Sequence, residues 1–298
     1  MLIIADDLTG AADTAVQFSK QGIRTALFLT TELDLRRVDA AVKVVAVTTG
    51  SRHCSRSEAK KRVASVVKKA LRKGCRRFYK KIDSTFRGNV GAELEALMEA
   101  DGADRLMLVP AYPAAGRTTK AGYQYVNGKL LHESGFARDP LEPAAESFIP
   151  AILGKETRLP VHIVGRQSVI AGETLEKNQD GIFVFDAEND ADLREIGELL
   201  DKSGNLDMAA GAAGFASMLS SYYGLQTLPG RVRPLSGPAR PLLIVNGSLN
   251  DVSLRQVARA EQEGVSVFLS AADASSIVQR LNDDGCALVT TARAHGGK

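Results

Sequence analysis

Cysteine is scarce in this chain of 298 residues, and the few cysteines form no pattern. Cys54, Cys75 and Cys286 are odd in number, lie far apart and include no Cys-x-x-Cys pair. Such spacing argues against a disulfide framework and against a zinc site built on cysteine. The four histidines also lack the spacing of metal ligands. We therefore expect a protein of a reducing compartment, the cytoplasm.

Long apolar runs and a strong charge are missing as well. No stretch approaches the roughly 20 apolar residues of a membrane-spanning helix, and no basic region precedes the first apolar run. The net charge of +3 is too small to indicate a nucleic-acid partner. Most of the local basic density lies in KKALRKGCRRFYKK (68–81), which an exposed helix end explains. We expect neither a membrane nor a nucleic acid as partner.

The composition is that of a globular protein, with 44% hydrophobic and 24% charged residues. Short apolar runs alternate with amphipathic stretches of helical length. This alternation predicts an α/β fold with a parallel sheet and helices on both of its faces. Ligands of such sheets bind beyond the carboxyl ends of the strands. The runs read as strands are 2–5, 25–29, 44–47, 77–82, 105–110, 162–164, 181–187 and 207–211.

Two segments interrupt the alternation. Residues 111–159 contain an Asn-Gly pair, at Asn127 and Gly128, that predicts a β-hairpin, and a segment this long is usually a lid or binding loop. Residues 226–241 are rich in proline and glycine and indicate a linker.

The length of the chain predicts two domains. We place a substrate-binding domain at residues 1–228, a linker at 229–240 and a partial nucleotide-binding α/β domain at 241–298. About sixty residues are few for an open α/β domain, so we expect the second domain to be truncated.

Two adjacent aspartates, Asp6 and Asp7, follow the first apolar run in ADDLTGAAD. Burying two carboxylates is costly unless cations or hydrogen-bond donors compensate. We expect Thr9 to cap a helix that begins near Gly10, where an acid is favoured by the helix dipole. Side chains alternate along a strand. One aspartate should therefore be a cap-like group, while the other, which we take to be Asp7, faces the ligand crevice.

A second polar cluster lies in YKKIDSTFRGNVGAEL (79–94), where another strand ends. Lys81 and Arg87 flank Asp83 and Ser84, and this combination suits an anionic ligand. The alternative is that Asp83 or Ser84 only caps the following helix and pairs with Arg87. Arg52 follows the strand at 44–47 and is either a second anion clamp or an exposed loop residue.

Two glycine-containing turns are weaker signals. Arg117 lies in the turn of VPAYPAAGRTTKAG (109–122), which we read as a surface turn. Gly247 and Ser248 follow a strand in IVNGSLNDVS (244–253), and a free helix start beside a glycine and a hydroxyl could hold a phosphate. The sequence contains neither a Walker loop nor a G-x-S-x-G elbow. It also has no G-x-G-x-x-G after any strand, which argues against a dehydrogenase.

Taken together, these motifs resemble those of the four-carbon acid sugar kinases in order and spacing, over essentially the whole chain. Within that family the chain is most similar to the D-threonate and D-erythronate kinases, whose middle motif carries K-x-D-S-T-x-R-G. The motifs are ADDLTGAADTAVQF, KKIDSTFRGNVGAEL, PAYPAAGRTTKAGYQYVNGKLLHESGFARDPLEP, FDAENDADL, GAAGFA and VNGSLN.

The resemblance implies an acid-sugar domain followed by an ATP-binding domain. It implies transfer of the γ-phosphoryl group of ATP to D-threonate or D-erythronate, by family analogy at the C4 hydroxyl, with Mg²⁺ arriving with the nucleotide. Asp7 or Asp83 would accept the hydroxyl proton, and we favour Asp7. The positions matching substrate-binding ones are Asp7, Arg52, Lys81, Ile82, Asp83 and Ser84, with Arg87 beside them; Ser248, next to Gly247, matches an ATP-contacting one.

A second hypothesis concerns the end of the sequence. The family has a later glycine-rich segment of the form T-G-G-[DE]-T-A on the nucleotide phosphates, and this sequence ends before it. The alternative function is therefore that of a truncated, catalytically impaired acid-sugar-binding protein. The sequence does not decide whether the protein forms a homodimer.

Overall fold

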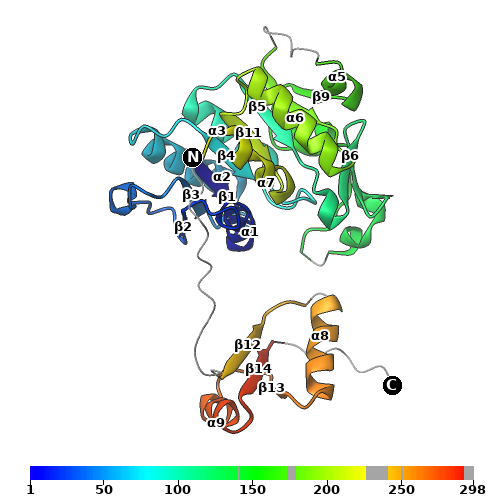
Figure 1. Ribbon diagram of the computed structural model, residues 1–298. Coiled ribbons are helices and arrows are strands. Elements are labelled where there is room, and N and C mark those ends of the chain that lie inside the picture. Colours follow the sequence, from blue (N-terminus) through cyan, green and yellow to red (C-terminus); the bar gives the residue numbers. More distant parts are fainter. Residues whose placement is uncertain (140, 173–178, 226–240, 250, 292–298) are drawn as a thin grey trace. The chain divides into compact units, whose positions relative to one another are not determined.

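The computed structural model describes residues 1–139, 141–172, 179–225, 241–249 and 251–291 (Figure 1). The chain divides into two compact units, Met1–Arg231 and Val232–Lys298. The linker predicted at 229–240 lies outside the described residues.

The first unit is built on an eight-stranded sheet in the order β2-β3-β1-β4-β11-β5-β10-β9. Every neighbouring pair in this sheet is parallel, which confirms the predicted α/β fold. Strand β1 lies between β3 and β4, so the loops that follow these three strands emerge side by side. The strands are β1 (Leu2–Ala5), β2 (Thr25–Phe28), β3 (Val44–Thr48), β4 (Phe78–Lys81), β5 (Arg105–Val109), β9 (Val161–Val164), β10 (Gly181–Phe185) and β11 (Met208–Gly211).

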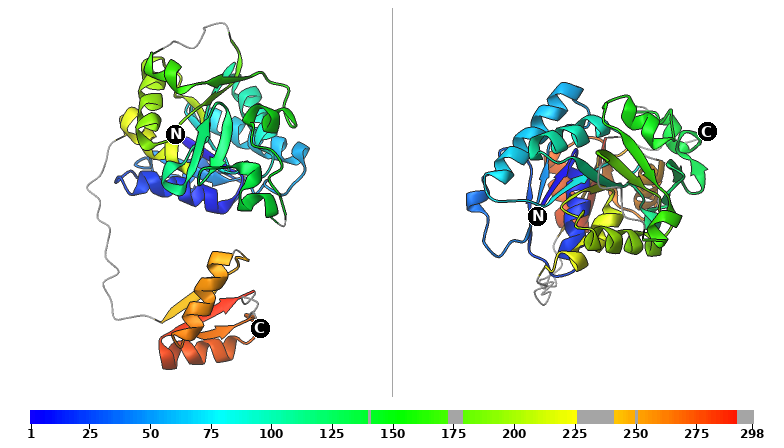
Figure 2. Two further views of the ribbon diagram at one scale, coloured as in Figure 1. Left: turned by 90° about the vertical axis from the view of Figure 1, so that its right-hand side faces the viewer. Right: turned by 90° about the horizontal axis from the view of Figure 1, so that it is seen from above.

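Helices cover both faces of this sheet, as Figures 1 and 2 show. Helices α2, α3 and α4 pack on one face, and α1, α5, α6 and α7 pack on the other. No helix in the described ranges is long and apolar enough to cross a membrane. The helices are α1 (Leu8–Ser19), α2 (Arg56–Leu71), α3 (Val90–Asp101), α4 (Ile149–Gly154), α5 (Arg166–Ile170), α6 (Asp190–Lys202) and α7 (Ala213–Tyr222), with 3₁₀ turns η1 (Leu35–Arg37), η2 (Pro113–Ala115), η3 (Leu131–Glu133) and η4 (Gly135–Arg138).

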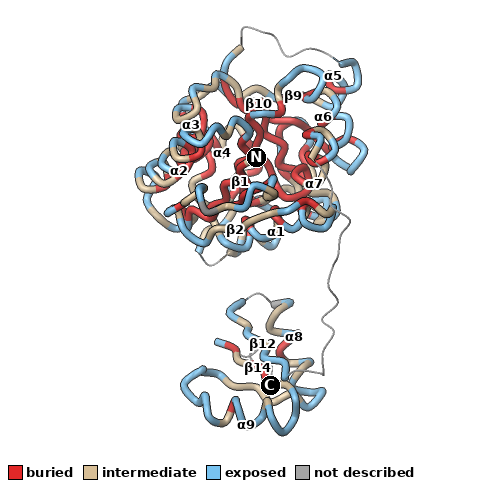
Figure 3. Tube along the Cα trace, turned by 60° about the vertical axis from the view of Figure 1, so that its left-hand side comes forward, coloured by how far each residue is buried: buried red, intermediate tan, exposed pale blue. Residues whose placement is uncertain are grey.

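The core is double because successive strand residues point to opposite faces. In β1, Leu2 and Ile4 belong to the core beneath α2 and α3, whereas Ile3 belongs to the core beneath α1 and α7. Figure 3 shows the strands of this unit as its buried centre. Strands buried on both faces need nearly continuous apolar runs, which is why these strands are readable in the sequence.

A small antiparallel sheet fills part of the segment that interrupts the alternation. It consists of β6 (Arg117–Lys120), β7 (Tyr123–Val126) and β8 (Lys129–Leu130). Asn127 and Gly128 connect β7 to β8 with φ angles of 50° and 78°, as a two-residue hairpin turn of the predicted kind requires. A bridge between Thr119 and Ala187 attaches β6 to the loop after β10.

Helix α1 begins at Leu8, two residues earlier than the sequence suggested. Its N-cap is Asp7, not Thr9, and the prediction of a Thr9 cap is wrong: the Asp7 Oδ1 accepts a hydrogen bond of 2.8 Å from the Gly10 backbone N–H. Asp7 has the extended backbone of an N-cap residue, and aspartate outranks threonine at that position. The cap and the crevice-facing acid are thus the same residue.

The second unit contains a three-stranded parallel sheet in the order β12-β14-β13. Its buried apolar residues are few, and include Val257, Ile277 and Leu288. Gly247 and Ser248 directly follow the first strand of this sheet. The elements are β12 (Leu242–Asn246), α8 (Asp251–Gln262), β13 (Ser266–Phe268), α9 (Ala274–Asp284) and β14 (Cys286–Thr290).

Candidate functional site

A cavity of 230 Å³ lies at the carboxyl ends of β1 and β4 in the first unit. Six of the residues singled out in the sequence line it, and they come from the end of β4 and from the loops after β1, β3 and β4: Asp7, Arg52, Lys81, Asp83, Ser84 and Arg87. The register explains this meeting, because Ala5 at the end of β1 pairs with Thr48 of β3 and with Lys81 of β4. The remaining lining residues are Thr9, Gly10, Asp13, Tyr112, Ala115, Arg117, Ala212 and Ala213.

Arg52 is the cation that compensates the two adjacent aspartates. Its Nε and Nη2 bind the two carboxylate oxygens of Asp6 at 2.7 and 3.1 Å, while Nη1 donates to Asp7 Oδ2 at 2.7 Å. Asp6 is only 3% exposed, so its charge depends on this fork. Burial by itself would lower the pKa of Arg52. The hydrogen bonds and negative charge of Asp6 have the larger effect, so the pKa of Arg52 is raised. Arg52 therefore lies in the cavity and is not an exposed loop residue.

Asp83 is held by donors on several sides. Its carboxylate accepts from the Thr85 backbone N–H at 3.1 Å and from the Thr85 hydroxyl, and Arg87 donates from Nε and Nη2, each at 3.0 Å. Burial alone would raise the pKa of Asp83, but the hydrogen bonds and charge of Arg87 prevail and hold it well below its usual range. Asp83 is thus a poor proton acceptor at neutral pH. It pairs with Arg87 without capping α3, whose N-cap position is Asn89.

The turn that carries Asp83 is strained. Phe86 adopts a φ of 59°, in the left-handed region that non-glycine residues rarely occupy. Such a conformation costs on the order of 1 kcal/mol and persists where the surroundings enforce it. Here the Phe86 ring is buried in the core beneath α2 and α3, and the Asp83 carboxylate ties down the neighbouring residues. The polar groups of this turn are therefore fixed before any ligand binds.

The ammonium of Lys81 and the hydroxyl of Ser84 make fewer hydrogen bonds within the described residues than Arg52 and Arg87 do. The Lys81 ammonium donates to the Ile82 carbonyl at 2.7 Å, and among the described residues it has no carboxylate at ion-pair distance. Burial lowers the pKa of Lys81, although the nearby carboxylates of Asp6 and Asp83 oppose that shift. The Ser84 hydroxyl has no hydrogen-bond partner in the described part of the chain, while the Ser84 carbonyl accepts from Gln124. Ile82 itself is buried and contributes through its carbonyl.

A buried ion pair behind the cavity was not recognised in the sequence. Lys80 Nζ lies 2.7 Å from Glu93 Oε2, and both side chains are almost completely buried. Glu93 also accepts from the Ser51 hydroxyl, so the pair connects β4, α3 and the loop that bears Arg52. A signal existed: in a sheet covered on both faces, neither lysine of the run FYKK can point to open solvent from mid-strand, so Lys80 needs an acidic partner.

Gly247 and Ser248 form a separate group in the second unit. Both are exposed and follow β12. The Asn246 side chain accepts from the Ser248 backbone N–H at 3.2 Å and donates to the Thr290 hydroxyl at 3.0 Å, which fixes this loop to β14. A Cβ on Gly247 would meet nothing within 4 Å, so the loop leaves open space around its backbone. The predicted phosphate cradle also includes Asn250, which precedes α8 in the sequence and lies outside the described residues.

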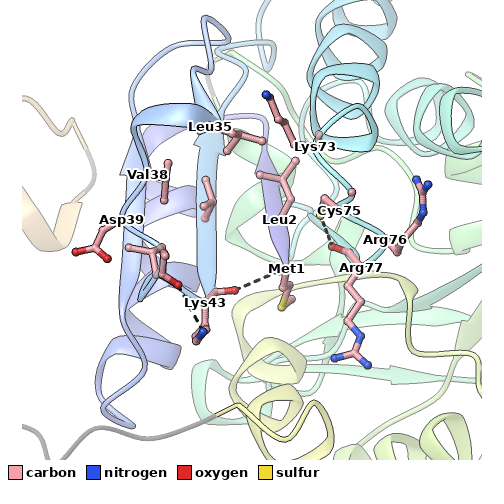
Figure 4. Close-up of a pocket in the computed structure, with 15 residues that line it drawn as sticks. Met1, Leu2, Leu35, Val38, Asp39, Lys43, Lys73, Cys75, Arg76 and Arg77 are labelled. Atoms are coloured by element: carbon pink, nitrogen blue, oxygen red, sulfur yellow. Dashed lines mark hydrogen bonds between the residues drawn. The ribbon is translucent and has the colours of Figure 1, made fainter.

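A larger cavity of 540 Å³ lies at the opposite, amino ends of the strands. Its lining includes the apolar side chains of Leu2 and Leu35, and Figure 4 shows Asp39, Arg76 and Arg77 pointing in different directions. Its charged groups do not converge on one point. Ligands of parallel sheets bind at the carboxyl ends. The smaller cavity around Asp7 is therefore the candidate site.

Comparisons with known proteins agree on one family. Residues 1–219 match the family described as "Sugar-binding N-terminal domain". The chain is 34% identical to the D-threonate kinase of Salmonella typhimurium, over 98% of this chain and 70% of the relative. It is 31% identical to the D-erythronate kinase of Heliobacterium modesticaldum, over 93% of this chain and 64% of the relative.

Solved structures show the same fold. A crystal structure of a domain of unknown function (DUF1537) from Bordetella bronchiseptica, a domain-swapped dimer with bound citrate, is 29% identical and has a TM-score of 0.64. It is matched over 100% of this chain and 75% of that one. This chain spans about two thirds of the length of its curated relatives. It belongs to the four-carbon acid sugar kinase family, whose sugar-binding N-terminal domain its first 219 residues contain.

Proposed function

We propose that this protein is an ATP-dependent kinase that phosphorylates a four-carbon sugar acid, D-threonate or D-erythronate, at the C4 hydroxyl. One observation carries the proposal: a small cavity at the carboxyl ends of β1 and β4 combines the carboxylate of Asp7 with a surplus of cationic side chains. Four cations (Arg52, Lys81, Arg87 and Arg117) and three carboxylates (Asp7, Asp13 and Asp83) line it. An acid sugar needs both its negative charge bound and a hydroxyl activated.

Asp7 is the residue that we assign to the reacting hydroxyl. Phosphoryl transfer depends on positioning and charge stabilisation, with a carboxylate that orients the hydroxyl and accepts its proton. Asp7 lines the cavity and is fixed by Arg52 and by the Gly10 N–H. Asp83 is the weaker candidate because its lowered pKa makes it a poor proton acceptor.

The other lining residues hold the acid. Lys81 and Ser84 supply donors for the sugar hydroxyls, and Arg52, Lys81 and Arg87 supply the positive field that attracts an anion. The buried Ile82 keeps Lys81 in place through its carbonyl. Arg52, Lys81 and Arg87 are fixed by hydrogen bonds before substrate binding, which reduces the entropy lost when the acid is positioned.

The second unit is proposed to contact the nucleotide through Gly247 and Ser248. Their exposed loop, with open space around Gly247, leaves room for a phosphate near backbone N–H groups. ATP would supply the phosphoryl group, which forms a bond to the substrate oxygen as its bond to ADP breaks, and Mg²⁺ would accompany the nucleotide and neutralise phosphate charge. No group of three or more potential metal ligands occurs in the described ranges.

The test is ADP formation by the full chain with D-threonate or D-erythronate, comparing wild type with Asp7→Asn. Asparagine is also a good N-cap, so helix α1 should remain intact while the proton acceptor is lost. We expect the variant to lose roughly 10²- to 10⁴-fold in kcat while calorimetry shows acid binding retained. The control is Asp39→Asn, which removes an exposed, ion-paired carboxylate outside this cavity.

Each result of this test has a distinct meaning. Turnover by the Asp7 variant at the wild-type rate would contradict the role of Asp7. Acid binding by the wild type without ADP formation would favour the alternative, a catalytically impaired acid-sugar-binding protein. A wild type that binds neither acid would contradict the proposed function itself.

A further inference from the structure

The cationic side chains of the cavity differ in how many carboxylates of the protein they are paired with. Arg52 binds both oxygens of Asp6 and one of Asp7. Arg87 is paired with Asp83 at 3.0 Å and with Asp139 at 3.3 Å. With Asp83 also 3.9 Å away, Arg52 has three carboxylates of the protein as partners, and Arg87 has two. They shape the cavity, but little of their hydrogen-bonding capacity remains for a ligand.

Arg117, at the start of β6, is different. Among its guanidinium nitrogens only Nη1 has a hydrogen-bond partner in the described part of the chain, the Ala115 carbonyl. Its Nε is buried and has no such partner, and no carboxylate of the described residues lies within ion-pair distance. A cationic donor left unpaired in a partly buried position is costly. The third nitrogen, Nη2, has no hydrogen-bond partner in the described part of the chain either, and a ligand carboxylate in the cavity would supply an acceptor for it.

The position of Arg117 is nevertheless fixed. Its guanidinium lies 5.4 Å from the centre of the Phe136 ring, and that of Arg87 lies 5.8 Å from the same ring. Two backbone hydrogen bonds between Arg117 and Tyr112, of 2.8 and 3.0 Å, hold its main chain. Contact with an aromatic ring uses the face of a guanidinium and leaves the N–H groups at its edge available for a carboxylate.

We propose that Arg117 binds the carboxylate of the substrate and thereby selects acids over uncharged polyols of the same length. Lys81 adds a second positive charge, since within the described ranges its ammonium donates only to the Ile82 carbonyl. With the carboxylate at Arg117, the hydroxyl end of the acid is left to Asp7 and Ser84, which line the same cavity. This inference rests on the proposed function and adds the residue that recognises the carboxylate of the substrate.

The test is calorimetric titration of the full chain with D-threonate, D-erythronate and the uncharged polyol threitol. In Arg117→Gln we expect acid affinity to fall by roughly ten- to a hundredfold, the cost of losing hydrogen bonds to a charged group. The variant should bind the acid no more tightly than wild type binds threitol. Arg117→Lys keeps the charge without the planar fork, so it should recover part of the affinity. Thermal unfolding of each variant reports its folding separately.

A matched control is Arg77→Gln, which removes an arginine that also contacts an aromatic ring, Tyr223, at 4.9 Å, but lies at the amino end of β4. Its acid affinity should equal that of the wild type. Wild-type acid affinity in the folded Arg117→Gln variant, or in Arg117→Lys if the first does not fold, would overturn the inference alone. So would an equal loss of acid and threitol binding. A wild type that binds no four-carbon acid would overturn the proposed function, and this inference with it.

Discussion

At the scale of single residues, the site is organised by which charges are paired within the protein. Asp6 is committed to Arg52, and Asp83 to Arg87 and Thr85. Asp7 combines two tasks, since it caps α1 and lines the cavity. The two adjacent aspartates therefore have different roles: Asp6 fixes Arg52, and Arg52 in turn fixes the carboxylate of Asp7.

Asp83 should link stability to pH. Its pKa is lowered in the folded state, so its stabilising contribution is present above the unfolded value of about 3.9 and is lost as the pH falls toward the folded value. We expect Asp83→Asn to destabilise the protein by about 3 kcal/mol at pH 7, because Arg87 loses a partly buried partner. The difference from wild type should shrink below about pH 4. Chemical denaturation of both proteins at pH 7 and pH 3 measures it, and an unchanged difference would contradict this account.

The sequence predicts which polar residues lie at the strand ends, because a polar group directly after an apolar run can be recognised from the neighbouring residues alone. Their partners were not readable. The contact between Arg52 and Asp6 depends on β1 lying beside β3, and that of Lys80 with Glu93 on how α3 packs. Arg117 was read as part of a surface turn, although it lines the cavity. Its place depends on the contact of β6 with the loop after β10, which no local pattern indicates.

At the scale of elements, the close approach of α1 to β4 builds one wall of the cavity. Gly10, in the first turn of α1, makes it feasible. A Cβ at this position would lie 2.6 Å from the Asp7 Oδ1 and 3.1 Å from the Lys81 Nζ. Even an alanine would therefore displace the two side chains that the proposed function needs most.

Gly10→Ala should accordingly weaken acid binding without the gain in stability of up to about 1 kcal/mol that alanine usually brings to a helix. Gly154→Ala is the matched control, since this glycine ends α4 and a Cβ there meets nothing within 4 Å. Calorimetry with D-threonate and thermal unfolding compare the two variants. Wild-type affinity in Gly10→Ala would show that the contact is not needed.

The strands themselves were predictable to within one or two residues, because strands buried on both faces require continuous apolar runs. The turn at Asn127 and Gly128 was readable as well, since its positive φ angles favour these residue types. The start of α1 was misplaced because both Asp7 and Thr9 can cap a helix, and the stronger N-cap preference of aspartate decides for Asp7. Strand order was not predictable, as it depends on contacts far apart in the chain.

At the scale of the whole molecule, the chain contains two α/β units of different size. The first holds all the residues of the candidate acid-sugar site, and the second holds Gly247 and Ser248. The two groups of candidate residues lie in different units, as expected if one unit binds the acid and the other binds the nucleotide. The central claim concerns the first unit: that its cavity at the ends of β1 and β4 binds a four-carbon sugar acid.

The most direct test is a crystal structure of the full chain grown with D-threonate or D-erythronate. We predict one acid molecule in the cavity lined by Asp7, Lys81 and Ser84, with its carboxylate at Arg117. An acid found instead in the larger cavity at the amino ends of the strands, or no acid bound at saturating concentration, would contradict the account.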